Sequence, residues 1–414
     1  MFNIFDANSP GKIKKINMPR VLRIINRFNL GGPTYNAAYL TKYLSPEFDT
    51  MLIGGHKDDT EDSSEFILEN LGVKPVIIPE MRRSINPFND YIALKKIQKI
   101  IHQFKPDIVH THASKAGTLG RIAALQSKVP VIVHTFHGHV FHSYFGPYKT
   151  RIYQNIERRL ANKSSKIIAI SENQKYELSQ VYNITEPDNI EVVSLGFDLS
   201  RFRNKQEEKR NYFREKYHLT DDEIAIGIIG RLVPIKNHQL FLEAFNRVQK
   251  KTNRKIRAFI VGDGECRQSL EQKARELNID YTINGQATCK KATLTFTSWM
   301  KNVDVVYAGL DLVNLTSHNE GTPVSLIEAQ AANKPVLTTN VGGVENIVLP
   351  YITALLAENN NVDDFTEKLL MLINKDKLRQ DMSKEGWNYV KEKFRYTRLI
   401  HNMSNLYNNL LNNN

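Results

Sequence analysis

Residues 317–329 read Ser317-His318-Asn319-Glu320-Gly321-Thr322-Pro323-Val324-Ser325-Leu326-Ile327-Glu328-Ala329 and set two glutamates eight positions apart. Glu320 precedes a Gly-Thr-Pro turn, whereas Glu328 lies in an apolar run with helical spacing. Proline suits the first position of a helix, because its missing N–H would be unpaired there anyway. The stretch therefore predicts a turn that leads into a helix at Pro323.

The first turn of such a helix leaves backbone amides free, and free amides attract a phosphate. Glu328 is expected in the second turn, where its carboxylate can accept hydrogen bonds from a diol. One short element thus offers a phosphate site between two acceptors, which matches a sugar nucleotide. A helix cap followed by a surface glutamate also arises by chance, so the interpretation depends on companion motifs.

A basic loop and a glycine loop each follow a predicted strand. Residues 230–237 (Gly-Arg-Leu-Val-Pro-Ile-Lys-Asn) set Arg231 and Lys236 five positions apart, and such a pair of cations suits a diphosphate. Residues 29–34 (Asn-Leu-Gly-Gly-Pro-Thr) can present backbone amides to a phosphate. Taken alone, the first is a common exposed basic turn and the second a plain tight turn.

A histidine-rich segment ends another predicted strand at residues 133–139 (Val-His-Thr-Phe-His-Gly-His). His137 can donate a hydrogen bond to a sugar hydroxyl and respond to charge in a transition state. Other histidines are near in sequence, namely His110, His112, His134, His139 and His142. Zinc is an alternative, but no acidic or cysteine partner stands at typical ligand spacing. We therefore expect no metal, and expect most of these histidines to be packing or acceptor-side residues.

Together these motifs resemble the signature of the retaining glycosyltransferases of family four (glycosyl transferases group 1). Two further turns, at residues 261–265 (Val-Gly-Asp-Gly-Glu) and 340–345 (Asn-Val-Gly-Gly-Val-Glu), are similar to family turns near the donor. The resemblance covers roughly residues 20–411. It implies an α/β protein with the GT-B fold, in which two Rossmann-like domains face each other across a cleft and a C-terminal helix crosses back to the first.

In that family the first glutamate holds hydroxyls of the donor sugar and the second holds the ribose. Carried over residue by residue, the resemblance implies catalytic roles for His137, Arg231, Lys236 and Glu320. It implies donor contacts for Gly31, Gly32, Gly138, Gly230, Gly321, Thr322, Pro323 and Glu328. Pro33 and Thr34 replace more usual small or acidic residues of the glycine loop and are expected to bear on the acceptor.

Short β-branched runs alternate with longer amphipathic stretches, which indicates parallel sheets built from right-handed crossovers. Predicted strands are 21–28, 50–54, 76–79, 107–111, 131–135, 166–170 and 191–195, then 224–230, 256–261, 280–283, 312–316 and 335–339. The polar stretch 198–222 is the expected interdomain link. We assign residues 1–204, joined by about 394–414, to an acceptor-side domain, and residues 205–393 to a nucleotide-sugar-binding domain.

Composition is ordinary for a soluble globular protein, with 41% hydrophobic and 24% charged residues in 414. The N-terminal segment has no apolar region before a cleavage site, so secretion is not expected. Two cysteines, Cys266 and Cys289, suggest neither a disulfide framework nor a metal site, and a reducing cytosol fits.

The net charge is +12, and residues 91–166 alone carry 13 basic against 2 acidic residues. Such a stretch attracts a diphosphate, an anionic membrane surface or a nucleic acid, or is simply a solvated face. Aromatic residues beside lysine and arginine at 141–159 favour peripheral binding to the inner face of the plasma membrane.

The expected function is transfer of a sugar of the hexosyl type from a nucleotide-diphosphate donor to a glycan or lipid-linked glycan in cell-surface polysaccharide synthesis. A UDP-sugar is the expected donor, a substrate rather than a cofactor. No Asp-x-Asp pair occurs, so cations and helix amides rather than a metal are expected to neutralise the diphosphate. The alternatives are a sugar-nucleotide 2-epimerase of the same fold, and a basic nucleic-acid-binding protein, which lacks a recognisable motif.

Overall fold

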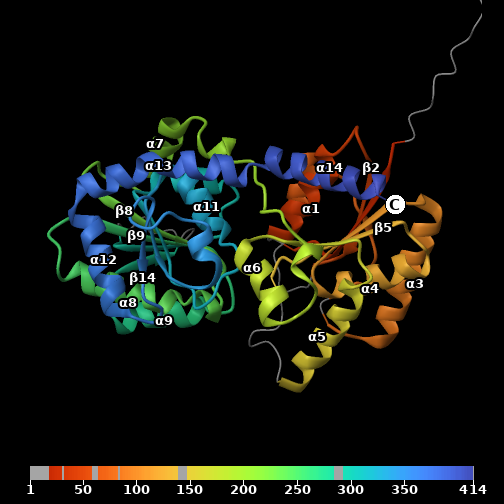
Figure 1. Cartoon of the computed structure of the whole chain (residues 1–414). Coiled ribbons are helices and arrows are strands. Elements are labelled where there is room, and N and C mark those ends of the chain that lie inside the picture. The colour runs from red at the N-terminus through yellow and green to blue at the C-terminus, as the bar shows by residue number, and fades with distance from the viewer. Residues whose placement is uncertain are drawn as a thin grey trace, which may run out of the picture.

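The computed structural model describes residues 18–29, 32–57, 64–82, 84–138, 147–283 and 292–413. It contains two seven-stranded sheets, each with helices on both faces (Figure 1). Every strand pairing within the two sheets is parallel. The predicted fold class, two Rossmann-like α/β domains, is confirmed.

The first sheet has the strand order β3-β2-β1-β4-β5-β6-β7. Its central strands form because β-branched runs are buried on both faces; all five residues of β4 and of β5 are buried. The elements are β1 (Arg20–Arg27), α1 (Gly32–Tyr43), β2 (Asp49–Gly55), α2 (Glu65–Leu71), β3 (Val76–Ile77), α3 (Pro87–Phe104), β4 (Ile108–His112), α4 (Ser114–Gln126), β5 (Val131–Thr135), α5 (Pro147–Ala161), β6 (Lys166–Ala169), α6 (Glu172–Tyr176) and β7 (Ile190–Val192).

The second sheet has the order β10-β11-β9-β8-β12-β13-β14. Helices α8, α9 and α12 pack on one face, and α7, α10, α11 and α13 pack on the other. The elements are η3 (Ser200–Phe202), α7 (Gln206–Lys216), β8 (Ile224–Ile229), η4 (Pro234–Lys236), α8 (His238–Gln249), β9 (Ile256–Val261), α9 (Arg267–Glu276), β10 (Tyr281–Ile283), β11 (Leu294–Ser298), α10 (Val303–Gly309), β12 (Leu312–Leu315), α11 (Val324–Ala331), β13 (Val336–Thr339), β14 (Ala354–Ala357), α12 (Val362–Asn374), α13 (Asp376–Phe394) and α14 (Tyr396–Asn412).

The sequence reading missed two strands, β11 and β14. The alternation of leucine, phenylalanine and threonine in β11 is nevertheless typical of a strand. By contrast, β14 consists of alanine and leucine, which favour helices, and only its pairing with β13 makes it a strand.

The stretch 198–222, predicted as the interdomain link, contains helix α7. Phe213 of α7 is fully buried against the second domain, and Arg210 Nη2 lies 2.7 Å from Asp311 Oδ1. Phe213 and Tyr217, four positions apart, give this polar stretch one apolar face.

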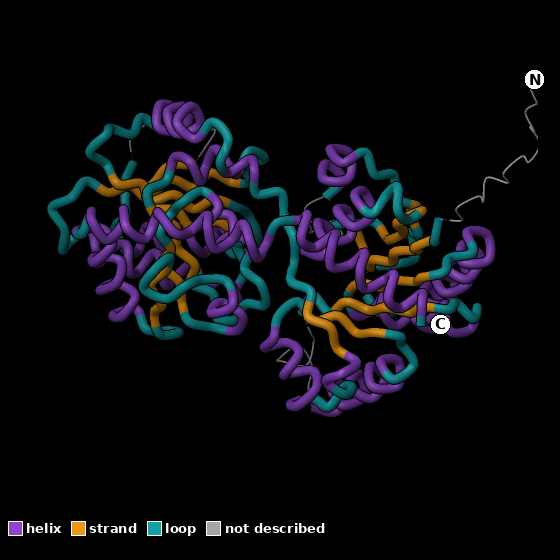
Figure 2. Tube along the Cα trace, turned by 45° about the horizontal axis from the view of Figure 1, so that its top comes forward, coloured by secondary structure: helices purple, strands orange, loops and turns teal. Residues whose placement is uncertain are grey.

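The chain crosses between the domains twice, at neighbouring points. The Phe197 amide donates to the Phe394 carbonyl at 2.8 Å, and the Tyr396 amide donates to the Phe197 carbonyl at 3.1 Å. Helix α14 then packs beside α1 on the first sheet, with Leu399 and Met403 in that core (Figure 1). In Figure 2 the two domains form separate lobes joined at these crossings.

Candidate active site

The predicted motifs lie at the carboxyl ends of central strands. The basic loop follows β8 and the glutamate loop follows its neighbour β12, where the strand order of the second sheet reverses. The glycine loop and the His137 segment likewise follow β1 and β5 of the first sheet. Ligands of open parallel sheets collect at such switch points, so the topology brings the motifs to two binding edges.

The glutamate loop and the basic loop are joined by a short ion pair. Lys236 Nζ lies 2.5 Å from Glu320 Oε1, and the Ser317 hydroxyl donates to the same oxygen at 2.6 Å. The Glu320 side chain is only 9% exposed and that of Lys236 is 21% exposed. Lys236, which is expected to bind phosphate, and Glu320, which is expected to bind sugar, thus form one largely buried ion pair.

Backbone contacts fix these two loops against each other. The Thr316 hydroxyl donates to the carbonyls of Lys236 and Asn237, at 3.1 and 2.9 Å. The His318 amide donates to the Ile235 carbonyl at 2.8 Å. The geometry of Lys236 and Glu320 is therefore held by the main chain and not by the two side chains alone.

A third loop, after β13, supports the glutamate loop from outside. The Gly343 amide donates to the Glu320 carbonyl at 2.8 Å, and a Cβ at Gly343 would lie 1.9 Å from the Gly321 carbonyl oxygen. Only glycine permits this approach, which explains the glycine pair at Gly342 and Gly343.

We expect Gly343→Ala to push the glutamate loop away from its present position. The overpacking should lower the unfolding free energy by about 1–3 kcal/mol. A shift of the loop by about 1 Å should also reduce turnover by up to about a hundredfold. Thermal unfolding and sugar-nucleotide turnover check this; an unchanged melting temperature with full turnover would contradict it.

Helix α11 begins at Val324, one residue later than predicted. Pro323 is therefore its N-cap rather than its first helical residue. Glu328 does lie in the second turn. The Gly321 position lies close to the first domain, because a Cβ there would be 3.9 Å from the His137 carbonyl oxygen. The turn that contains Thr322 thus faces the His137 segment of the other domain.

Glu328 has a partner that the sequence reading missed. Arg201, on η3 at the domain crossing, places Nη2 3.3 Å from Glu328 Oε1. Burial raises the pKa of Glu328, and Arg201 opposes that shift. The charges of Glu328 and Arg201 also act on Tyr35 of α1. Burial and then Glu328 raise the pKa of the Tyr35 phenol, while Arg201 lowers it. The predicted ribose carboxylate thus lies where both domains and their connection meet.

His137 of the histidine-rich segment contacts His112, the last residue of the neighbouring strand β4. His112 Nδ1 and His137 Nε2 are 3.0 Å apart. Burial lowers the pKa of His137 to about 3, and burial, then His110 and His137, hold the pKa of His112 well below its usual value. Both rings are therefore neutral near pH 7. Gly138 follows with a φ of 144°, a conformation that side-chain-bearing residues rarely adopt.

The histidines do not converge on one point. His110 and His112, two positions apart on β4, both point to the face of the sheet covered by α14. His134 points to the opposite face, where a Cβ at Gly117 of α4 would lie 2.4 Å from its ring. Among the described residues, no group of three or more His, Cys, Asp or Glu side chains is placed to hold a metal ion. His139 and His142 lie outside the described residues.

The glycine loop is described in part, because Gly31 lies outside the described residues. Gly32 is the first residue of α1. The Thr34 side chain is 1% exposed and donates to the Asn29 carbonyl at 2.8 Å. The Thr34 hydroxyl therefore closes the loop, and the expectation that Thr34 bears on the acceptor stays a prediction.

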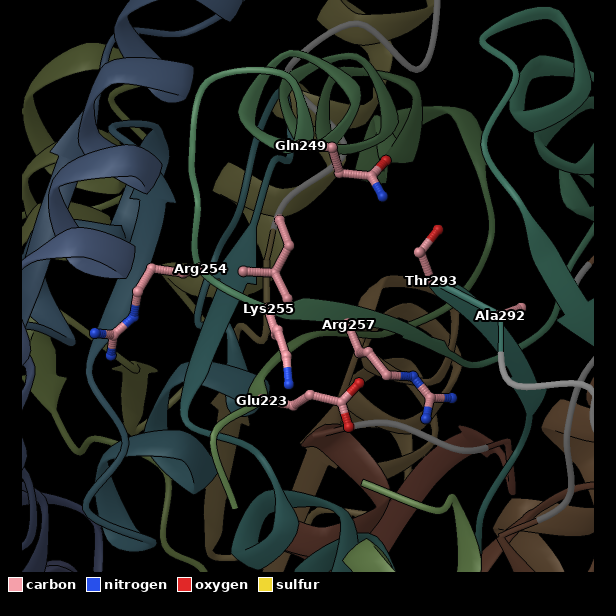
Figure 3. A pocket seen from close by; sticks show the side chains of 8 residues that line it. Glu223, Gln249, Arg254, Lys255, Arg257, Ala292 and Thr293 are labelled. Carbon is pink, nitrogen blue, oxygen red and sulfur yellow. The ribbon is translucent and has the colours of Figure 1, made fainter. Parts of the chain in front are cut away.

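Arg231 is exposed and forms no ion pair with any residue in the described ranges, so its guanidinium is available. Gly230, which precedes it, leaves open space where a Cβ would stand. The pocket in Figure 3 is a different place, at the amino ends of β9 and β11, opposite the motif loops. Its lysine is already paired, since Lys255 Nζ lies 2.6 Å from Asp222 Oδ2.

None of the described helices combines the length and apolarity that a membrane span requires.

Comparison with known proteins identifies the family of the chain. The family model for Glycosyltransferase Family 4 matches residues 30–201, and the model for Glycosyl transferases group 1 matches residues 209–388. UDP-Gal:alpha-D-GlcNAc-diphosphoundecaprenol alpha-1,3-galactosyltransferase of Escherichia coli is 29% identical over 340 residues, 81% of this chain and 84% of the relative. The capsular polysaccharide biosynthesis glycosyltransferase CapM of Staphylococcus aureus is 28% identical over 336 residues, 81% of this chain and 85% of the relative.

Solved structures share the fold. A glycosyltransferase from Rickettsia africae superimposes with a TM-score of 0.76 at 22% identity, covering 96% of this chain and all of the other. HepE of Anabaena, solved in complex with UDP, gives 0.77 at 16% identity, covering 94% of this chain and all of the other. Because the two family models match consecutive parts of the chain and together cover most of it, and because these relatives are named glycosyltransferases, the chain belongs to the family-four glycosyltransferases.

Proposed function

We propose that this glycosyltransferase moves a hexose from a UDP-sugar to a lipid-linked glycan during cell-surface polysaccharide synthesis, with retention of configuration and without a metal. The observation that carries the proposal is the Lys236–Glu320 pair, which joins a phosphate-binding cation to a hydroxyl-binding carboxylate between two strand ends. The name of the Escherichia coli relative, which gives a UDP-Gal donor and a diphosphoundecaprenol-linked acceptor, supports the class of donor and acceptor. The name of the Staphylococcus aureus relative supports a role in polysaccharide synthesis.

The donor is proposed to lie along the glutamate loop. Its diphosphate contacts Arg231, Lys236 and the free amides at the start of α11. Its sugar contacts Glu320 and His137, and its ribose contacts Glu328. This order follows the chain itself, because the start of α11 separates the two glutamates.

Donor binding replaces ion pairs that are present in the free protein by contacts with the donor. Phosphate replaces Glu320 beside Lys236, and sugar hydroxyls then take over Glu320. The ribose similarly shares Glu328 with Arg201. Because Arg201 lies at the domain crossing, this exchange offers a route by which donor binding adjusts the two domains.

The chemical step needs stabilisation of charge on the departing diphosphate. Lys236, Arg231 and the helix amides supply it, in the place that a metal ion has in glycosyltransferases with an Asp-x-Asp pair. The anomeric carbon–oxygen bond breaks as the acceptor hydroxyl attacks from the same face. The leaving phosphate takes the proton of that hydroxyl, so retention requires no separate general base.

The acceptor is proposed to approach the first domain from an anionic membrane surface. Helix α5 exposes Tyr148 and Ile152 beside Arg151, and α3 exposes Phe88 and Tyr91. Both helices lie on the sheet face also covered by α4. Apolar side chains with nearby cations suit a peripheral position on the inner face of the plasma membrane.

Flotation with vesicles tests this part separately. We expect the protein to float with vesicles that contain anionic lipid at low salt, and less so at high salt, where the charges are screened. Equal behaviour with zwitterionic vesicles would contradict the membrane proposal but leave the transferase proposal intact.

A thermal-shift panel of UDP-, GDP- and ADP-sugars, with and without EDTA, tests the donor. A ligand at about a hundred times its dissociation constant should stabilise the protein by about 2.7 kcal/mol. We expect an EDTA-insensitive shift with UDP-sugars that weakens in Glu328→Ala. No thermal shift with any sugar nucleotide would contradict the proposal. Product analysis without an acceptor distinguishes the epimerase alternative, because an epimerase changes the sugar of the sugar nucleotide.

A further inference from the structure

The row of polar side chains beneath His137 is unusual for the core of a parallel sheet. Arg23, His110 and His112 are all fully buried on the face covered by α14, where apolar residues are the rule. The strand register explains their contacts. In the parallel register, His110 lies opposite Val133 and His112 lies opposite Thr135. The side chain of each histidine contacts the residue two positions further along the chain, Thr135 for His110 and His137 for His112.

His110 is held from both sides. Its Nδ1 lies 2.6 Å from the Tyr407 hydroxyl of α14, and its Nε2 lies 2.7 Å from the Thr135 hydroxyl. Arg23 donates to the same Tyr407 oxygen at 3.2 Å, so the phenol is free to donate its own proton to His110. The His110 ring is therefore a fixed support for His112, whose ring lies 4.1 Å away between centroids.

Within the described part of the chain, the polar contact of the His112 ring is with His137 alone. Its other nitrogen, Nε2, is buried without a hydrogen-bond partner among the described residues, and the same is true of His137 Nδ1. A buried ring nitrogen without a partner needs an explanation, and a bound ligand would supply one for His137 Nδ1. The contact also leaves Nδ1 as the one His137 nitrogen available to a ligand.

We propose that His112 is a positioning residue for sugar transfer, which holds the His137 ring and sets its tautomer through the Nδ1–Nε2 hydrogen bond. When His112 donates from Nδ1, His137 accepts at Nε2 and carries its proton on Nδ1. His137 Nδ1 is then a donor for a hydroxyl of the donor sugar. This inference rests on the proposed function, in particular on His137 as the sugar contact.

The test compares variants of His112 in UDP release from the sugar nucleotide that the wild type turns over, and in binding of UDP alone. His112→Leu should lower kcat by about ten- to a hundredfold, because the His137 ring loses its orientation. Its affinity for UDP, which lacks the sugar, should stay unchanged. His112→Asn should recover most of the activity, because an Asn amide can occupy the place of Nδ1, whereas His112→Gln, whose amide reaches past it, should not.

His134→Leu is the matched control. It removes a buried histidine from the neighbouring strand whose Nδ1 lies 2.8 Å from the Thr111 hydroxyl, but on the opposite face of the sheet. It should leave the kcat of sugar-nucleotide hydrolysis unchanged. Equal losses in His112→Leu and His134→Leu, or equal activity of the Asn and Gln variants, would overturn the inference. The Asn and Gln comparison decides the matter even if the leucine variant fails to fold.

His137→Ala separates this inference from the function on which it rests. If His137→Ala lowers kcat and His112→Leu does not, only the positioning role of His112 is wrong. If His137→Ala has full activity, or if the wild type releases UDP from no sugar nucleotide, the proposed sugar contact is wrong and the inference falls with it.

Discussion

Lys236→Ala should lower kcat/KM for sugar transfer by about a hundred- to a thousandfold, the effect typical of removing one preorganised charge stabiliser. The cation lies 2.5 Å from Glu320, so its loss also leaves that largely buried carboxylate with the Ser317 hydroxyl as its one side-chain partner among the residues that the structure describes. Most of the effect should be on kcat, because charge on the diphosphate is greatest as the bond breaks. Steady-state UDP release measures it.

Lys255→Ala is the matched control for this experiment. Lys255 forms an ion pair of 2.6 Å with Asp222, but at the opposite edge of the same sheet and largely exposed to solvent. It should change neither kcat nor KM. Equal losses in both variants would mean that Lys236 acts on stability rather than on the leaving group, and unchanged turnover in Lys236→Ala would contradict its catalytic role.

The first domain should unfold in mild acid before the second. His110, His112, His134 and His137 are all in the first domain, and burial lowers the pKa of each. The unfolded chain, with histidine pKa values near 6.5, binds more protons than the folded one, so stability falls as the pH drops below about 6.5 toward 3. Between pH 7 and pH 5.5, each of these histidines should lower the free energy of unfolding by about 1 kcal/mol, which gives a loss on the order of 4–5 kcal/mol in total.

That loss is a large fraction of the about 5–15 kcal/mol by which domains are typically stable. In the second domain, burial lowers the pKa of His238 to about 3, while burial shifts the pKa of Glu328 upward and so acts in the opposite direction. Both tryptophans, Trp299 and Trp387, lie in the second domain and report on it alone.

Urea unfolding at pH 7.5, 6.5 and 5.5 checks this expectation. The transition followed by circular dichroism should move to lower urea as the pH falls, ahead of the transition followed by tryptophan fluorescence. His134→Leu should flatten the pH slope of the first domain by about a quarter, because it removes one of four titrating groups. Parallel shifts of the two signals would contradict the assignment to the first domain.

Local patterns predicted the strands and the positions of the motifs well, because both depend on residues near one another in sequence. The run before Lys236 and the run before Glu320 are recognisable as strands that end in polar turns. The same patterns failed for β14, whose alanines and leucines carry no strand preference. They also failed for α7, where a few aromatic residues in a charged stretch decide the burial.

Other features depend on strand order and register, which no local pattern contains. Residues 84 positions apart meet in the Lys236–Glu320 pair, and residues 127 positions apart meet in the Arg201–Glu328 pair. The sequence reading placed His110, His112 and His134 near one another, but the alternation of side chains along paired strands puts His134 on the other face.

The family, the two parallel-sheet domains and the loops that carry the candidate residues follow from motif order and hydrophobic alternation, both of which are local features of the chain. Which of those residues meet follows from the folded arrangement. It paired His112 with His137 through the register of β4 and β5, and brought Arg201 to Glu328 at the domain crossing. The physical reason is that these contacts arise where strands adjoin and where the chain passes between domains, and both are set by the packing of the whole chain.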